Sequence, residues 1–121
     1  MLNIRNESEA DYQAVEDLTR RAFYNLYVPG CHEHYLVHIM RDHPDFLPEL
    51  DFVLELDGKI VGSILYTKAS LTGETGERRE ILTFGPVCVA PEHQRQGYGK
   101  TLMEHSFAKA AALGWGAVVI F

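Results

Sequence analysis

One stretch decides the fold of this 121-residue chain: Val87-Cys88-Val89-Ala90-Pro91-Glu92-His93-Gln94-Arg95-Gln96-Gly97-Tyr98-Gly99-Lys100. An apolar run ends at Val89, and Ala90-Pro91 breaks it. After the Gly-x-Gly sequence, apolar residues recur at helical spacing, beginning with Leu102 and Met103. The stretch therefore predicts a strand, a tight polar loop and a helix.

The start of that helix is expected to bind an anion. The first turn of a helix has free backbone N–H groups and a partial positive charge. The two glycines let a ligand approach the backbone closely, and Arg95 and Lys100 add positive side chains. A phosphate group fits such a site. Nucleotide motifs fit less well, because the P-loop spacing is absent and Leu102 stands where a Rossmann fingerprint needs its third glycine.

The longer pattern Val-x-Pro-Glu-x-Gln-x-x-Gly-x-Gly resembles the acyl-CoA pyrophosphate loop of the GNAT superfamily of N-acetyltransferases. The segments 4–12, 52–62 and 82–87 also look like that superfamily, so the resemblance covers nearly the whole chain. It implies one GNAT domain over residues 1–121, of the α/β class with an α+β mixed sheet. The expected order is an N-terminal strand, two helices, an antiparallel three-strand meander, a CoA-binding helix and a following parallel strand.

The local patterns give the bounds of these elements. Ser8 and Asp11 form a near capping box at the start of the first helix, and Asp57-Gly58 is a strong two-residue hairpin signal. The expected elements are a strand at 2–5, a helix from Ser8 to between 24 and 27, a helix at 33–41, a loop at 46–50, strands at 52–56 and 59–67, a polar turn at 72–79, a strand at 80–89 and a helix from 97 or 98 to 113.

Gly85-Pro86 lies inside the strand that leads into the loop. Proline cannot donate to a sheet ladder, and glycine within a strand often marks a bulge. We therefore expect a bulge here, although an ordinary edge irregularity is the alternative. In the family that the chain resembles, this strand is splayed from its neighbour, and the pantetheine and thioester lie in the gap.

The last residues, 115–121, begin another apolar strand, and the sequence ends there. The superfamily usually continues with a fourth helix and two strands, which often supply a tyrosine as general acid, so we expect a domain that is incomplete at its C-terminus. A fragment, a natural short protein and a fold completed by another chain all remain open. An exposed edge on the apolar residues 118–121 predicts a homo-oligomer formed through this region.

Composition narrows the function classes. The net charge of −6 and the pI of about 5.4 argue against nucleic-acid binding, which depends on Lys and Arg. No apolar run approaches the roughly 20 residues of a membrane helix. The N-terminus shows no signal-peptide pattern, and Cys31 and Cys88 form no disulfide framework. A cytoplasmic protein without membrane contact is the expectation.

The resemblance implies acetyl transfer from acetyl-CoA to an amine by direct attack, with no metal. Backbone groups of Val87, Cys88 and Val89 would orient the pantetheine, and a free N–H near Cys88 or Val89 would polarise the thioester carbonyl. The remaining cofactor-binding residues are expected in the loop and the helix start: Gln94, Arg95, Gln96, Gly97, Tyr98, Gly99 and Lys100.

A general base is harder to identify. Some family members carry a glutamate where Thr83 stands, and threonine is not a base. Glu80 lies on the same strand and is a weak candidate that would act through water. The base can also be absent, because proximity alone lowers a barrier by several kcal/mol. Cys88 as a nucleophile is less favoured than Cys88 as a buried packing residue.

The acceptor is expected near the first two helices, because that region often lines the acceptor site in the family. His34 and His38 are one helical turn apart, but no partner ligands support zinc. A small-molecule or peptide amine is the expected partner. A truncated, non-catalytic CoA-binding or interaction module is the alternative function. The candidate substrate residues are Tyr27, Cys31, His32, Glu33 and His34, of which Tyr27, His32 and Glu33 are the main ones.

Overall fold

A computed structural model describes residues 2–23, 37–38, 40–115 and 118–120. The regular elements are β1 (Leu2–Asn6), α1 (Tyr12–Phe23), β2 (Phe52–Leu56), β3 (Lys59–Thr72), β4 (Arg78–Val89), α3 (Tyr98–Ala112) and β5 (Val118–Ile120). Short 3-10 turns are η1 (Glu9–Asp11), η2 (Pro48–Leu50) and η3 (Pro91–His93). Of the second helix expected at 33–41, residues 37, 38 and 40 are described and are helical.

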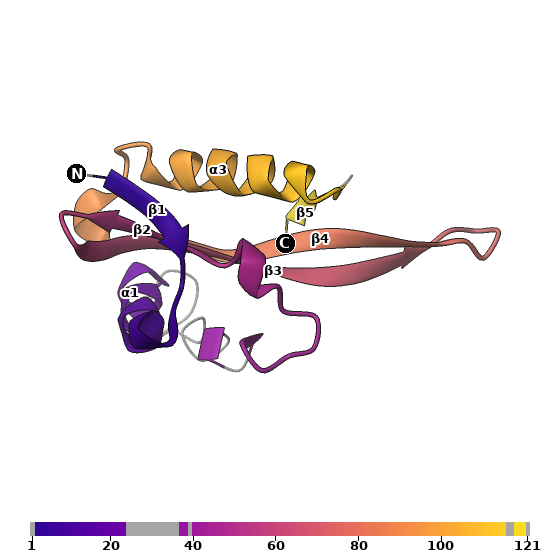
Figure 1. The fold of residues 1–121 in the computed structure, drawn as a ribbon, viewed down its shortest axis with the longest axis horizontal. Helices are drawn as coiled ribbons and strands as arrows, with labels where there is room; N and C mark the ends of the chain where they lie inside the picture. Colours follow the sequence, from indigo (N-terminus) through magenta and orange to yellow (C-terminus); the bar gives the residue numbers. More distant parts are fainter. Residues whose placement is uncertain (1, 24–36, 39, 116–117, 121) are drawn as a thin grey trace.

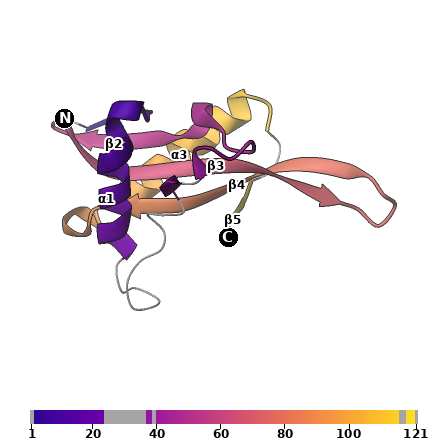
Figure 2. The same ribbon diagram turned by 90° about the horizontal axis from the view of Figure 1, so that it is seen from below.

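The strands form one sheet in the order β1-β2-β3-β4-β5. All neighbouring pairs are antiparallel except β4 and β5, which run parallel. α3 covers one face of this sheet, and α1 crosses the other (Figures 1 and 2). The predicted mixed α+β sheet with its meander and following parallel strand is therefore confirmed.

Alternation along β3 assigns the residues of this strand to the two faces. Leu65 packs in a buried cluster with Val15 of α1 and Val53 of β2, whereas the Tyr66 hydroxyl lies 2.7 Å from the hydroxyl of Ser106 in α3. Side chains in a strand alternate between faces. From Gly62 to Lys68, odd-numbered residues of β3 therefore face α1 and even-numbered residues face α3, whereas Ile60 lies before a register shift with β2 and packs against the cluster on the α1 face.

Local signals in the sequence formed as predicted at the start of the first helix and at the first hairpin. The Ser8 N–H and hydroxyl both bond to the Asp11 carboxylate, at 2.8 and 2.9 Å. Arg5 donates to the same carboxylate, and this pair lowers the pKa of Asp11 well below its usual range. Asp57 and Gly58 both have positive φ angles, 53° and 83°, as a two-residue type I′ turn requires.

The hairpin between β3 and β4 is longer than predicted. The strand expected at 59–67 continues to Thr72, and the return strand begins at Arg78, so the turn spans residues 73–77 rather than 72–79. Near the turn the added pairs include Ser70 with Glu80 and Thr72 with Arg78, and the Arg78 guanidinium donates to the Ser70 hydroxyl. Backbone pairing extends these strands where no apolar alternation marks them. The region expected as loop at 46–50 likewise contains the 3-10 turn η2.

The predicted bulge is present in β4. Ile64 pairs with Val87, and Tyr66 pairs with Phe84. Gly85 and Pro86 of β4 therefore together oppose the single residue Leu65 of β3. Such a bulge adds one residue to one strand and disrupts the ladder locally. It lies directly before the part of β4 that enters the loop.

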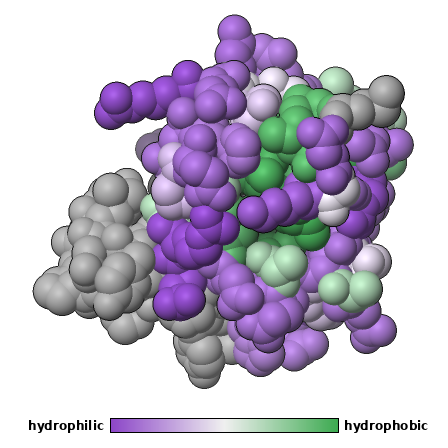
Figure 3. Space-filling model, turned by 90° about the vertical axis from the view of Figure 1, so that its left-hand side faces the viewer, coloured by the Kyte–Doolittle hydropathy of each residue, from purple (hydrophilic) through white to green (hydrophobic). Residues whose placement is uncertain are grey.

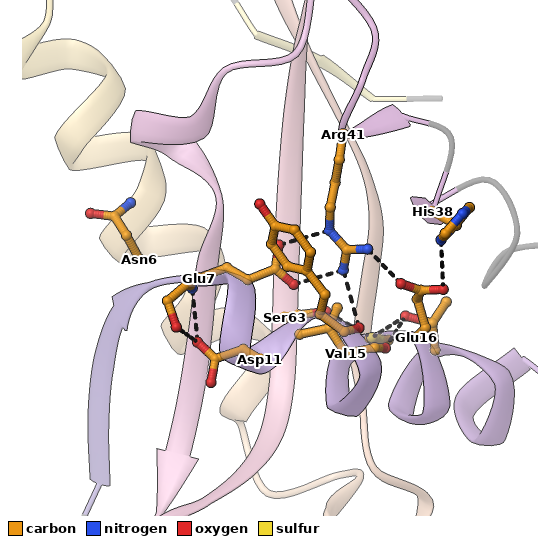
Figure 4. Close-up of polar contacts among 12 residues, drawn as sticks. Asn6, Glu7, Asp11, Val15, Glu16, His38, Arg41 and Ser63 are labelled. Atoms are coloured by element: carbon orange, nitrogen blue, oxygen red, sulfur yellow. Dashed lines mark hydrogen bonds and ion pairs between the residues drawn. The ribbon is translucent and has the colours of Figure 1, made fainter.

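A buried ion cluster holds the segment after residue 40 against the rest of the fold (Figure 4). The Arg41 side chain is 5% exposed and donates to both oxygens of Glu7, at 3.0 and 2.8 Å. It also donates to Glu16 of α1 at 2.6 Å and lies 4.1 Å from the ring centre of Tyr12. One arginine therefore joins the end of β1, helix α1 and the chain around residue 41.

Asp51 lies beside this cluster and is almost fully buried. Its carboxyl bonds to the Glu7 carboxyl, and burial together with the Glu7 charge raises the pKa of Asp51 to about 9. Two adjacent carboxylates cannot both ionise cheaply in a buried site. Asp51 therefore keeps its proton at neutral pH and donates it to Glu7.

Asp51→Asn is expected to remove a pH dependence of stability. In the wild type the folded state holds a proton that the unfolded state releases above about pH 4, so stability falls by up to about 1.4 kcal/mol per pH unit until the folded pKa near 9. The side-chain amide of the variant would still donate to Glu7 without titrating. Chemical denaturation at several pH values between 5 and 8 would measure both slopes, and equal slopes would contradict the assignment.

Gly62→Ala is expected to destabilise the fold by about 1–3 kcal/mol through overpacking. A Cβ atom at Gly62 would lie 3.0 Å from Leu102 of α3 and 3.3 Å from the Cys88 carbonyl oxygen. Gly99→Ala is the matched control, because its Cβ would meet only Val89, at 3.8 Å. Thermal unfolding without ligand should separate the two variants, and equal melting temperatures would contradict the packing argument.

Candidate functional site

The loop after β4 folds back onto the end of that strand. The Ala90 N–H donates to the Val61 carbonyl at 2.8 Å, which continues the pairing with β3 by one residue. The loop then forms η3, and the Gln94 side-chain amide donates to the Val89 carbonyl at 3.1 Å. Gln94 was expected among the cofactor-binding residues, and its amide group braces the loop against the strand.

Two residues of the loop have left-handed backbone conformations. Arg95 has φ 66° and Gly97 has φ 82°. No atom lies within 4 Å of the position that a Cβ on Gly97 would occupy. Gly97 is therefore required by its backbone angle, and the space beside it is open. Arg95 adopts a conformation that is unfavourable for a side-chain-bearing residue, and strain of this kind is common at ligand sites.

Helix α3 starts directly after this turn with unpaired backbone donors. The first intrahelical bond is from the Thr101 N–H to the Gly97 carbonyl at 3.0 Å, and the Thr101 hydroxyl donates to the same oxygen. No side chain caps this helix start. The N–H groups of Tyr98, Gly99 and Lys100 have no intrahelical acceptor, so the turn offers a cluster of donors at the positive end of the helix dipole.

The charges around the helix start also favour an anion. Arg95 and Lys100 are exposed, and Lys100 lies 3.7 Å from Glu104 in a fully solvated pair. The nearest acidic residue of the loop, Glu92, is held by Arg21 of α1 at 2.7 and 2.5 Å, and this arginine lowers the pKa of Glu92. The negative charge of Glu92 is thereby paired with Arg21 and does not oppose an anion at the helix start.

The end of β4 has a strand partner on one side in the described part of the chain. Residues 87–89 pair with β3, whereas β5 pairs only with residues 82–84. Because the Ala90 N–H points to β3, the backbone groups of Cys88 also point to β3 and those of Val87 and Val89 point to the open edge. Sequence analysis left Cys88 or Val89 as the free N–H, and the pairing favours Val89 together with Val87.

The Cys88 side chain is buried on the α1 face. Its sulfur lies 3.0 Å from the Ser63 hydroxyl and 3.6 Å from the Thr19 hydroxyl. A thiol that is 3% exposed and packed among hydroxyls fits the expected packing role better than a nucleophilic one.

The other candidates are spread over the molecule. Glu80 is exposed and lies opposite Ser70 on the outer half of the long hairpin. Thr83 is buried, with its hydroxyl 2.9 Å from that of Thr67. His38 is exposed beside Glu16. Within the described ranges no three metal-ligating side chains gather. The expected acceptor residues Tyr27, Cys31, His32, Glu33 and His34 lie outside the described residues.

Sequence reasoning missed the link between Arg21 and Glu92, and no signal in the sequence marks it, because the residues are 71 positions apart. The mixture of polar and apolar side chains on the surface around the helix start could not be predicted from the sequence either. The end of the molecule that carries the start of α3 is mostly polar, with an apolar patch between the polar side chains (Figure 3). A ligand with a charged and an apolar part suits such a surface.

No helix among the described residues is long and apolar enough to cross a membrane.

Solved structures share this fold. A GNAT family acetyltransferase from Brucella melitensis in complex with acetyl-CoA superposes with a TM-score of 0.85 at 26% identity, over 99% of this chain and 75% of that chain. The GNAT family N-acetyltransferase YhbS from Escherichia coli in complex with CoA has a TM-score of 0.83 at 24% identity, over 99% of this chain and 62% of that one. The chain thus spans between about two thirds and three quarters of these relatives.

At the level of sequence, the chain matches a family profile and no individual curated protein. The profile of the acetyltransferase (GNAT) family matches residues 12–121, which is most of the sequence and includes the loop and the start of α3. Since both this profile and the solved structures agree with the geometry of the loop, the chain belongs to the acetyltransferase (GNAT) family.

Proposed function

We propose that this chain is an N-acetyltransferase that transfers the acetyl group of acetyl-CoA to a primary amine of a small molecule or peptide by direct attack. The observation that carries the proposal is the turn through Arg95 and Gly97, which presents the unpaired donors of α3 beside the open edge of β4. The complexes of the two relatives with acetyl-CoA and CoA support it.

The residues present fit an acyl-CoA. The backbone N–H groups of residues 95–100 would bind the pyrophosphate, with Arg95 and Lys100 adding positive charge. The outward backbone groups of Val87 and the Val89 N–H would hold the pantetheine as a neighbouring strand would, since the Val89 carbonyl already accepts from Gln94. One of their N–H groups would polarise the thioester carbonyl, which makes that carbon more electrophilic. Bound acetyl-CoA supplies the activated acetyl group.

The proton of the attacking amine needs an acceptor. Glu80 remains a candidate base acting through water, and Tyr27, His32 and Glu33 remain candidate contacts of the acceptor. Thr83 lies in a hydroxyl pair with Thr67, and a hydroxyl has no capacity to take the proton. Proximity of a neutral amine to the thioester would then supply much of the catalysis.

A non-catalytic CoA-binding or interaction module is the alternative. The observation that favours it is Thr83, a hydroxyl paired with Thr67 at the position where some family members carry a glutamate. A homo-oligomer, proposed through the apolar residues 118–121, would also suit this function. Both functions predict CoA binding at the same loop, so turnover must separate them.

The enzyme is expected to release free thiol from acetyl-CoA when an acceptor amine is present. A thiol-detecting assay with a panel of primary amines, run beside the matching alcohols, would measure this release. Thermal stabilisation by CoA without thiol release for any amine would favour the binding module. Stabilisation by ATP and not by CoA would contradict both functions.

Gly97→Glu and Gly99→Glu are each expected to weaken CoA binding at least ~100-fold. A carboxylate would stand where the pyrophosphate binds, and Gly97 would also lose its favourable left-handed conformation. Gly76→Glu is the matched control, because Gly76 has a φ of 87° with open space around it at the far tip of the hairpin. Calorimetry that finds unchanged CoA affinity in the loop variants would refute the assignment.

Arg95→Ala is expected to weaken CoA binding only about two- to fivefold, because an exposed charge contributes less than about 1 kcal/mol and most contacts would be backbone. Arg95→Gly makes the same charge change without the left-handed strain. Similar CoA affinities of the two variants would assign the effect to charge, and a loss as large as that of Gly97→Glu would show that the side chain dominates.

A further inference from the structure

A cavity of about 480 Å³ lies apart from the loop and the start of α3. This volume is within the range of small-molecule sites. It lies between the segment after residue 40 and the middle of β3. The residues that line it are Met40, Asp42, His43, Pro44, Asp45, Thr67 and Lys68.

The cavity opens on the face of the sheet that carries α1. Thr67 follows Ser63 and Leu65 on that face, and Thr67 pairs with Thr83 of β4 as Ser63 pairs with Cys88. Four residues along a strand span roughly 13 Å. Along the strand direction, the cavity is therefore roughly 13 Å from the end of β4 at which the thioester is proposed to lie.

The wall of the cavity is fixed at both of its ends. At the start, Arg41 is held by Glu7 and Glu16 in the buried ion cluster. At the end, the Asp45 carbonyl accepts from the Lys68 N–H at 2.9 Å, and Phe46 forms an isolated antiparallel bridge with Thr67. Residues 42–45 are thus pinned between two anchors, and a wall fixed before binding lowers the entropic cost of a ligand.

The lining combines apolar surface with negative charge. Met40 and Pro44 are the apolar residues of the lining, and Asp42 and Asp45 are its acidic residues. Lys68 lies opposite Leu82 in the sheet, so its side chain is on the α3 face and its backbone borders the cavity. The His43 ring accepts from the Asp45 N–H through Nδ1 at 3.1 Å, so its neutral form carries the proton on Nε2 and adds no positive charge. The lining therefore complements a cation with an apolar body.

We propose that this cavity is an acceptor subsite that binds an ammonium group on an aliphatic chain, remote from the amine that is acetylated. The preferred acceptors are then diamines or longer polyamines rather than monoamines. The inference rests on the proposed acetyl transfer for the role of the bound molecule, whereas binding itself is independent of CoA.

The binding test uses hexylamine and hexanol as probes without CoA. Amide chemical shifts in ¹⁵N-labelled protein should move around residues 42–45 and 67–68 with hexylamine, and its affinity should exceed that of hexanol at least tenfold. The variant Asp42→Asn/Asp45→Asn should lose at least fivefold for hexylamine and nothing for hexanol. The control variant Glu49→Gln/Glu74→Gln removes two exposed charges elsewhere and should bind as the wild type does.

The turnover test compares diaminooctane, which has an amine at each end, with octylamine. The KM for the diamine should be at least tenfold lower, and Asp42→Asn/Asp45→Asn should remove that difference between the two amines. Hexylamine binding without any acetyl transfer would support the subsite and overturn the proposed function. Equal affinities for hexylamine and hexanol, an unchanged double variant, or equal KM values for the two amines would overturn the subsite.

Discussion

The hydrogen bond from the Ala90 N–H to the Val61 carbonyl is the contact on which the candidate site depends. It fixes which backbone groups at the end of β4 are used within the sheet. After the bulge, the backbone groups of Cys88 are turned toward β3, and the N–H groups of Val87 and Val89 are turned to the other edge, which no described strand pairs. The open donors beside the loop are thus a consequence of ordinary sheet pairing. The chemistry of the site is held by the same bonds that stabilise the sheet.

Helix α3 is placed by a different set of forces. Its buried residues Leu102, Ser106 and Ala110 pack on the sheet, and the missing side chain of Gly62 lets the helix approach β3 closely. The left-handed conformation of Gly97 then turns the chain into the helix, whose first turn places Gly99 next to Val89 at the end of β4. Apolar burial sets the position of the helix, and backbone conformation sets the direction of its donors. Neither requires a ligand, so the proposed anion site would be formed before a ligand binds.

Much of the fold and of the loop could be predicted from the sequence because the signals are local. The capping pair Ser8 and Asp11, the turn at Asp57-Gly58 and the break at Gly85-Pro86 each act within a few residues, and each formed as predicted. The extended hairpin was missed because backbone pairing, and not apolar alternation, carries it. The cluster around Arg41 and the cavity beside it depend on residues between 25 and 34 positions apart, and no spacing rule connects them. Glu80 as the general base also remains a prediction, because no spacing rule connects a base with the residues that surround it in the fold.

The bulge at Gly85-Pro86 determines which face of the sheet each later side chain of β4 occupies. If the same residues paired regularly after Phe84, without the bulge, Cys88 would lie opposite Gly62 and face α3, and the side chains of Val87 and Val89 would face α1. The backbone N–H groups would change direction too, so those of Val87 and Val89 would bond to β3 and that of Cys88 would point to the open edge. A strand of the same length that paired regularly would therefore leave the composition of the loop intact and reverse its geometry. Chains with the same glycine motif but an unbulged strand would share the pattern of letters without sharing the site.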